Sequence, residues 1–465
     1  MKKDIKDIIL VAAVVILWLI AVFWGVYFSY PRNEFINQNL EHYETPYSCK
    51  DCNVVMISID TLRADHTGFM RYFRNTTPNL DKLAKESVVF ENAFSQAPST
   101  TPSHASIFTS LYPSQHGTFN NNYQVPSKFV TLAEIMKSNG YNTVAFVGDA
   151  AVSASFGFHR GFEIYNEHSL LFSETVPKAI KWIESNKKKR FFLFLHGYEP
   201  HEPYGNSEFS DLFTETIYSG QFTSDKEIFI NEIESVSKNT DLSEDDINYI
   251  KAKYDGDIRQ VDKFIGLLIN KLKTLGLYDK TTFIIFSDHG ERLGEIRPNS
   301  QKPIFGHYDL YDVVLHTVLI IRSPNLELSK RVQQVVSSID ISPTVLELAG
   351  IGKFKQFKGK SLLDAIFNET ESFSISETLW LPGFDASVRT SGWKFIVRGN
   401  GILELYDLKN DNKELNNVIE KNPEVADGLF KILENTLIDT NKEPPEKAIV
   451  EGRILENLKR LGYIT

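Results

Sequence analysis

Five short runs of apolar residues, rich in β-branched and aromatic side chains, constrain the fold of this chain more than any other feature. They span residues 54–59, 143–147, 191–195, 283–286 and 318–321. Continuous rather than alternating apolar character is typical of strands that are covered on both faces, as in a parallel or mixed sheet. Segments with helical periodicity lie between the runs, and the longest covers 254–275. The pattern predicts an α/β fold in which a large, mostly parallel or mixed β-sheet is flanked by helices.

The first 31 residues predict a membrane anchor. Residues 8–31 contain no charged side chain and end in bulky aromatics. A helix needs about 20 apolar residues to cross a bilayer, and this stretch is long enough. A cleaved signal peptide would have a shorter apolar stretch followed by small residues, so we favour an uncleaved signal anchor. We therefore expect a single-pass membrane protein whose remaining residues face the periplasm or the cell exterior.

The rest of the chain divides into three predicted parts. Residues 32–50 are polar and irregular, which predicts a stalk. Residues 51–350 contain the apolar runs and form the main domain. From 351 to 465 the pattern changes to short antiparallel strands near 393–397 and 403–405 followed by a helix. This change predicts a small C-terminal α+β subdomain.

The two cysteines, Cys49 and Cys52, stand directly before the first apolar run. Outside the cytosol, a C-x-x-C pair in this position favours a local disulfide. The alternative is a redox motif, which normally opens a helix rather than preceding a strand. Two cysteines also exclude a disulfide scaffold and an all-cysteine metal site.

The net charge of the chain limits the classes of partner that we expect. The chain has 60 acidic and 50 basic residues, and its net charge is -10. A general nucleic-acid-binding protein needs a basic face, so no nucleic-acid partner is expected.

Polar residues that can bind a metal follow three of the apolar runs. Asp60 ends the first, Asp288 and His289 end the fourth, and His196 ends the third, with His201 five residues later. In open α/β sheets the ligand crevice lies at the carboxyl ends of the strands. A single aspartate after a strand is more often a turn or helix cap, but three strand ends together favour a divalent-metal site.

The segment Ser99-Thr100-Thr101-Pro102 precedes a helical pattern. Proline prefers the first turn of a helix, so we expect Thr101 to be the N-cap and Thr100 to lie just outside the helix. Free N–H groups at a helix N-terminus bind oxyanions, and a hydroxyl beside a divalent cation can lose its proton and attack an ester. The alternative is ordinary capping with surplus hydroxyls.

These residues lie in motifs that resemble the sulfatase family of the alkaline phosphatase superfamily, over about 400 residues. The matching stretches include NVVMISIDTLRADHTG at 53–68, TPNLDKLAKESVVFENAFSQAPSTTPSHASIFTSLYPSQHG at 77–117, LHGYEPHEPY at 195–204, YDGDIRQVD at 254–262 and TTFIIFSDHGERLGE at 281–295. The resemblance implies a metal-assisted, ester-cleaving site within residues 51–350.

The resemblance also implies roles for residues at matching positions. Asp60, Asp288 and His289 are metal ligands, and Thr100 is the nucleophile that contacts the same metal. His201 matches a histidine that contacts the anionic group, and His307 matches a histidine near the leaving group in related transferases. His104 stands where the family has an oxyanion-binding arginine, and with Thr101 it completes the expected substrate-binding set.

Two departures from the family pattern shape the expected chemistry. Sulfatases have Cys or Ser where Thr100 stands, because that residue is oxidised to formylglycine, and histidine at position 104 cannot copy a bidentate arginine clamp. A threonine nucleophile followed by an Asp-His pair resembles phosphoethanolamine and lipoteichoic-acid-type transferases, which are membrane-anchored and pass through a phospho-threonine.

We therefore expect cleavage of phosphate esters through a covalent Thr100 intermediate, by hydrolysis or by transfer. The first alternative is a sulfuric ester hydrolase that acts without formylglycine. The second is a catalytically silent membrane-tethered protein that binds an anionic glycan or lipid. The expected cofactor is one divalent metal ion, with Mn or Zn favoured by the imidazole ligand and Ca or Mg also compatible. The expected substrate is an ester on a glycan, a lipid or a small molecule.

Overall fold

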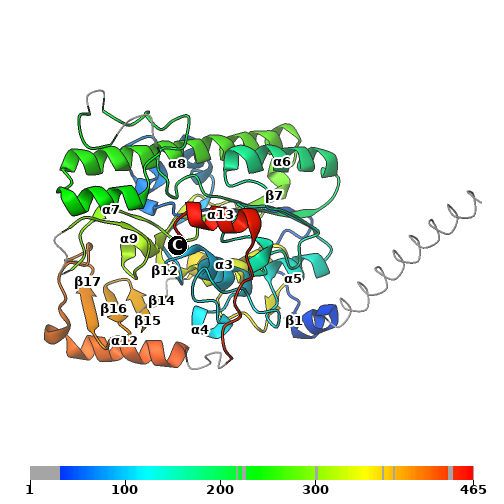
Figure 1. Ribbon diagram of the computed structural model, residues 1–465. Coiled ribbons are helices and arrows are strands. Elements are labelled where there is room, and N and C mark those ends of the chain that lie inside the picture. Colours follow the sequence, from blue (N-terminus) through cyan, green and yellow to red (C-terminus); the bar gives the residue numbers. More distant parts are fainter. Residues whose placement is uncertain are drawn as a thin grey trace, which may run out of the picture.

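The computed structural model describes residues 32–215, 218–222, 227–298, 302–368, 371–380, 383–437 and 443–463 (Figure 1). Its centre is a nine-stranded mixed sheet with the strand order β10-β3-β11-β7-β2-β6-β4-β5, and β12 pairs with β3. The predicted apolar runs form β2 (Asn53–Ile59), β4 (Asn142–Phe146), β6 (Phe191–Gly197), β7 (Thr281–Ser287) and β11 (Leu319–Arg322). The predicted α/β fold with a mixed sheet is confirmed.

The middle of the sheet is parallel and one side of it is antiparallel. β2 pairs in parallel with β6 and β7, and β4 pairs in parallel with β6 and β5. β11 runs antiparallel to both β7 and β3. The remaining strands of this sheet are β3 (Val88–Phe94), β5 (Ile164–Asn166), β10 (His316–Thr317) and β12 (Lys330–Ser337).

Helices cover both faces of the sheet, which explains why its strands are apolar throughout. Successive side chains of a strand point to opposite faces, so Val54 and Met56 lie in one core and Val55 and Ile57 in the other. The first core is covered by α3 (Thr100–Thr109), α5 (Leu132–Ser138) and α10 (Ile341–Leu348). The second is covered by α2 (Pro78–Ala84), α6 (Phe172–Asn186) and α8 (Glu244–Thr274), the last two of which lie along the top of Figure 1.

Four antiparallel strands and one helix form the smaller unit at the lower left of Figure 1. They are β14 (Phe373–Trp380), β15 (Gly383–Thr390), β16 (Trp393–Val397), β17 (Leu403–Asp407) and α12 (Pro423–Thr436). The strands expected near 393–397 and 403–405 are thus present. The unit is smaller than the expected 351–465, because Phe354, Leu362 and Leu458 on either side of it are buried in the core of the main domain.

The segment expected to be a stalk, residues 32–50, instead packs against the main domain. Residues 32–39 are helical, and β1 (Leu40–Glu41) pairs with β13 (Lys353–Phe354). Ile36 in this helix and Leu40 in β1 are both buried in the main core, and their burial explains the docking. The anchor predicted for 1–31 lies outside the described residues. Among the helices that are described, none has the length and apolar character needed to cross a membrane.

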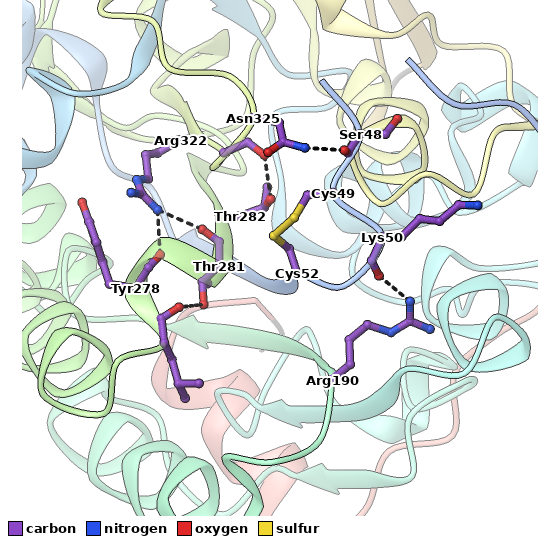
Figure 2. Close-up of a disulfide and its surroundings, with 12 residues drawn as sticks. Ser48, Cys49, Lys50, Cys52, Arg190, Tyr278, Thr281, Thr282, Arg322 and Asn325 are labelled. Carbon is purple, nitrogen blue, oxygen red and sulfur yellow. Dashed lines mark hydrogen bonds between the residues drawn. A yellow bond between two sulfur atoms is a disulfide. The ribbon is translucent and has the colours of Figure 1, made fainter. Parts of the chain in front are cut away.

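A disulfide joins Cys49 to Cys52, with 5.3 Å between their Cα atoms. Figure 2 shows it directly before β2, beside the hydrogen bond that Asn325 Nδ2 donates to Ser48 O at 2.6 Å. Cys49 N also donates to Leu348 O at 2.7 Å. The expected local disulfide is present, and these contacts fix the point at which the chain enters its central strand.

The other elements are short or connect the two units. They are β8 (Arg292–Glu295), β9 (Ile304–Gly306), α4 (Pro113–His116), α7 (Ile230–Asn239), α9 (Asp312–Leu315), α11 (Leu362–Phe367) and α13 (Gly452–Arg460). In Figure 1, α13 crosses the middle of the molecule in front of α3, beside the marked chain end.

Candidate active site

The predicted nucleophile and metal ligands converge at the carboxyl edge of the central strands. Asp60 follows β2 and Asp288 and His289 follow β7, and these two strands are parallel neighbours. Thr100 is the first residue of α3. All four side chains are fully buried. The sheet therefore brings together residues that are up to 229 positions apart, as the strand-end rule predicts.

Short distances connect the four side chains. Thr100 Oγ1 lies 3.3 Å from Asp60 Oδ2 and 3.3 Å from His289 Nε2. His289 Nε2 lies 3.5 Å from Asp288 Oδ2 and 3.8 Å from Asp60 Oδ1. One ligand atom from each of Asp60, Asp288 and His289 lies within 4.8 Å of the others. This spacing suits a shared cation.

Two buried carboxylate oxygens of this cluster show whether its residues fit a metal. Within the part of the chain that the structure describes, Asp60 Oδ1 and Asp288 Oδ2 have no hydrogen-bond partner. An unsatisfied buried acceptor costs about 1–3 kcal/mol, and burial raises the pKa of Asp60 to about 7. A divalent cation would satisfy both oxygens. Two carboxylates, an imidazole and a hydroxyl therefore fit a divalent metal.

Backbone groups hold the ligands in orientation. His289 Nδ1 lies 2.9 Å from Gly290 O, so this nitrogen donates and Nε2 faces the cluster. Asp288 Oδ1 accepts from the amides of His289 at 2.9 Å and Thr61 at 3.3 Å, which leaves Oδ2 for a metal. Thr61 has φ 53°, a left-handed conformation that is rare for a β-branched residue. This strained backbone conformation directs the Thr61 amide toward Asp288, one of the predicted metal ligands.

The structure places Thr101 differently from the expectation. The N-cap of α3 is Ser99, and Thr100 lies inside the helix. Thr101 N donates to Asn121 Oδ1 at 2.9 Å, and Thr101 Oγ1 donates to Ala151 O at 2.9 Å. Both donors of Thr101 are used within the protein, so in this arrangement it has no free N–H or O–H for a substrate oxyanion.

His104 also faces the protein rather than a substrate. Its Nδ1 lies 2.8 Å from Thr100 O and its Nε2 lies 2.9 Å from Ser58 Oγ. Burial lowers the pKa of His104 to about 3, so the ring is neutral. Side chains on a helix point back toward the preceding turn, which places His104 behind Thr100. The residue supports the backbone of the nucleophile instead of binding an oxyanion as expected.

His201 and His307 lie in the site as the resemblance implies. Their ring centroids are 5.1 Å apart, and the ring of His307 lies 4.5 Å from that of His289. His201 Nδ1 donates to Glu202 O at 2.9 Å, so its Nε2 carries the lone pair. Burial lowers the pKa of His307 to about 4 and that of His201 well below its usual range. Of the residues that the structure places, none hydrogen-bonds the Nε2 of either ring.

Two further residues belong to the site: His196, named from the sequence only as a strand-end candidate, and Tyr463, which the sequence did not suggest. His196, in β6, has its Nε2 3.6 Å from Asp60 Oδ2. The signal for it was the same as for Asp60, a polar residue at the end of an apolar run. The hydroxyl of Tyr463 lies 2.8 Å from Thr100 Oγ1. No local pattern points to Tyr463, because its role depends on where α13 packs.

The site is enclosed. His201 and His307 are each 1% exposed, and Tyr463 is 8% exposed. A cavity of about 220 Å³ adjoins the site; it is lined by residues that include Tyr198, His201 and Leu461.

Comparison with known proteins identifies the family. Residues 52–351 match the sequence family described as sulfatase. The chain belongs to the sulfatase family. Residues 303–443 also match the family described as N-sulphoglucosamine sulphohydrolase, C-terminal.

Named relatives support the same assignment. Arylsulfatase K of Bos taurus is 26% identical, over 77% of each chain, and an ulvan-active sulfatase of Formosa agariphila is 26% identical, over 83% of this chain and 79% of the relative. The solved phosphonate monoester hydrolase of Agrobacterium radiobacter has a TM-score of 0.70 at 20% identity, covering 83% of this chain and 95% of that one, and therefore shares the fold.

This sulfatase is thus a metal-dependent ester hydrolase, and its curated relatives act on sulfuric esters. The expected preference for phosphate esters finds less support than the alternative of sulfate esters, because the curated relatives are arylsulfatases.

Proposed function

We propose that this sulfatase hydrolyses sulfate esters with Thr100 as the covalent nucleophile. The observation that carries the proposal is the position of the Thr100 hydroxyl, 3.3 Å from both Asp60 Oδ2 and His289 Nε2 at the N-terminus of a buried helix. The arylsulfatase relatives support sulfate as the group that is transferred.

In the first step, Thr100 Oγ1 attacks the sulfur of the ester in line, and its proton passes to Asp60 Oδ2. The bond between sulfur and the leaving oxygen breaks. A divalent cation held by Asp60, Asp288 and His289 would acidify the hydroxyl and stabilise negative charge on the ester. The bound anion raises the pKa of His307 by charge attraction, and protonated His307 gives a proton to the leaving oxygen.

In the second step, water attacks the sulfur of the threonine sulfate. His201 Nε2 carries the lone pair and accepts the proton of the water. Oγ1 of Thr100 leaves and recovers its proton from Asp60. His201 then gives its proton to solvent and His307 takes one up, so both histidines return to their starting states. One ester and one water are consumed, and an alcohol and sulfate are formed.

A second candidate, cleavage of phosphate esters by hydrolysis or transfer, is favoured by one observation. Thr100 stands where sulfatases have the residue that becomes formylglycine, and threonine cannot form that aldehyde. A structural neighbour, the phosphonate monoester hydrolase, is named for phosphorus chemistry.

For the organic part of the substrate we propose a sulfated glycan, supported by the ulvan-active relative. For the location we propose a membrane-anchored enzyme whose catalytic domain is periplasmic or extracellular. The disulfide between Cys49 and Cys52 supports an oxidising compartment.

The test uses the purified full chain loaded with Mn²⁺. Release of p-nitrophenol from p-nitrophenyl sulfate, p-nitrophenyl phosphate and bis-p-nitrophenyl phosphate is compared for wild type, Thr100→Ala and the neighbouring control Thr101→Ala. We expect sulfate release that only Thr100→Ala abolishes, with a sulfate adduct on Thr100 by intact mass. Turnover of the phosphate compounds with a phosphate adduct would favour the second candidate. Sulfate release that survives in Thr100→Ala would refute the proposed nucleophile.

A further inference from the structure

The residues that follow α13 occupy the place next to the nucleophile. The Tyr463 hydroxyl lies 2.8 Å from Thr100 Oγ1, closer than Asp60 Oδ2 or His289 Nε2, both at 3.3 Å. Reacting atoms must approach to about 3–3.5 Å before a bond can form. The phenol oxygen already stands within that distance of the attacking atom. An ester therefore cannot reach Thr100 while Tyr463 is in this position.

Tyr463 occupies the site but leaves two of its buried histidine nitrogens without a hydrogen bond from any described residue. Its ring centroid lies 5.0 Å from that of His201 and 6.1 Å from that of His307. Yet in the described part of the molecule the Nε2 atoms of both histidines remain without a hydrogen-bond partner, although both rings are buried. A tetrahedral oxyanion presents several oxygens and can engage more of these groups than one phenol. Such a ligand competes with Tyr463 for the site.

Residues 452–463, the α13 segment, are held by a small apolar contact and by polar contacts at the protein surface. Only Leu458, Leu461 and Tyr463 are buried in the main core. Asn457 Nδ2 donates to Asp149 O at 2.8 Å, and Arg453 pairs with the carboxylate of Asp149 and donates to His168 Nδ1 at 2.8 Å. Arg460 pairs with Glu227 at 3.4 Å, and Ile454 is partly buried against the main core. The opposite face of the helix is exposed. The helix of this segment buries one face and exposes the other. Figure 1 shows where α13 lies.

Two glycines bracket this helix. Gly452 has φ 56° and Gly462 has φ 70°, both in the left-handed region that favours glycine. A side-chain carbon added at Gly452 would meet no atom within 4 Å, so the chain at that end of the helix lies in open space. Backbone rotation at such positions is how terminal elements swing away from a domain.

We propose that the α13 segment is a displaceable plug that closes the active site, with Tyr463 in the place of the group to be transferred. The inference rests on the proposed function, because it assigns the space beside Thr100 to the substrate. Binding of substrate requires the plug to leave. The α13 residues Arg453, Asn457, Arg460 and Leu461 line the adjoining cavity, so departure of the plug also removes one wall of that cavity. Activity is then set by the fraction of molecules in the open state.

The first test measures kcat/KM for p-nitrophenyl sulfate on the full, Mn²⁺-loaded chain. A minor open state is typically populated at about 0.1–10%, so Tyr463→Ala should raise kcat/KM by about tenfold or more. Arg453→Ala, which removes the ion pair with Asp149, should also raise kcat/KM. Lys459→Ala, an exposed change on the same helix, is the matched control and should have no effect. Comparable losses of activity in Tyr463→Ala and Tyr463→Phe would make Tyr463 a catalytic residue and overturn the plug.

The second test does not depend on turnover, so it separates the plug from the proposed function. Mn²⁺ is stripped from the loaded chain with excess EDTA, and the metal that stays with the protein is measured after desalting at successive times. The plug covers the ligands, so release should be about tenfold or more faster in Tyr463→Ala than in wild type or Lys459→Ala. Far-UV circular dichroism checks that each variant is folded. Equal release rates in folded variants would refute the plug, whatever the substrate.

Discussion

Two substitutions at Thr100 separate its hydroxyl from its methyl group. Thr100→Val keeps the shape of this fully buried side chain and removes the nucleophile. A well-oriented nucleophile has an effective molarity of about 10⁵ M or more, against roughly 55 M for a water that replaces it, so kcat/KM should fall by at least about 10³. That loss corresponds to about 4 kcal/mol of transition-state stabilisation.

Thr100→Ser keeps the hydroxyl and removes one buried methyl group. The lost burial should lower the free energy of unfolding by about 1 kcal/mol, while kcat/KM stays within about tenfold of wild type. Urea unfolding and steady-state hydrolysis of p-nitrophenyl sulfate measure the two quantities on the same samples. The reasoning fails if Thr100→Val keeps more than a tenth of the activity, or if Thr100→Ser loses as much as Thr100→Val.

Three further predictions concern metal, pH and backbone strain. Mn²⁺ at about 100 times its Kd should raise the free energy of unfolding by about 2.7 kcal/mol, and Asp288→Ala should abolish the shift in urea titrations; an undiminished shift would place the metal elsewhere. Burial lowers the pKa of His116 from its usual 6.5 to about 3. Between these values the unfolded chain binds a proton that the folded chain does not, so below pH 6.5 wild type should lose on the order of 1 kcal/mol per pH unit relative to His116→Gln, and a pH-independent difference would contradict this. Because residue 61 has φ 53°, Thr61→Gly should be more stable than Thr61→Ala by about 1 kcal/mol in thermal unfolding; equal stability would remove the argument for strain.

Local patterns in the sequence predict much of the sheet and part of the site. The uninterrupted apolar runs identify strands that are covered on both faces, because such strands have no polar side to alternate with. Asp60, Asp288 and His289 follow those strands directly, and the strand-end rule places them at one edge without knowledge of the strand order. The role of Thr100 came from its position before a helix together with the family resemblance.

Tertiary packing determined the orientation of His104 and the position of residues 32–50, which the local sequence patterns do not predict. His104 has the chemistry to bind an anion, but the direction of side chains on α3 turns it toward Ser58 and the backbone of Thr100. The residues expected to form a stalk contain Ile36 and Leu40, whose burial needs a partner surface that only the folded domain provides. Neither outcome is encoded in the spacing of nearby residues.

The sequence alone therefore determined five of the nine strands of the sheet and which polar groups lie at its carboxyl edge, since both depend on short-range patterns. The tertiary structure alone decided which groups face the nucleophile and how the site is closed. Tyr463 reaches Thr100 across 363 positions of sequence because Leu458 and Leu461 bury their side chains in the main core. These leucines are buried only when α13 packs against the main domain, and that contact exists only in the folded chain.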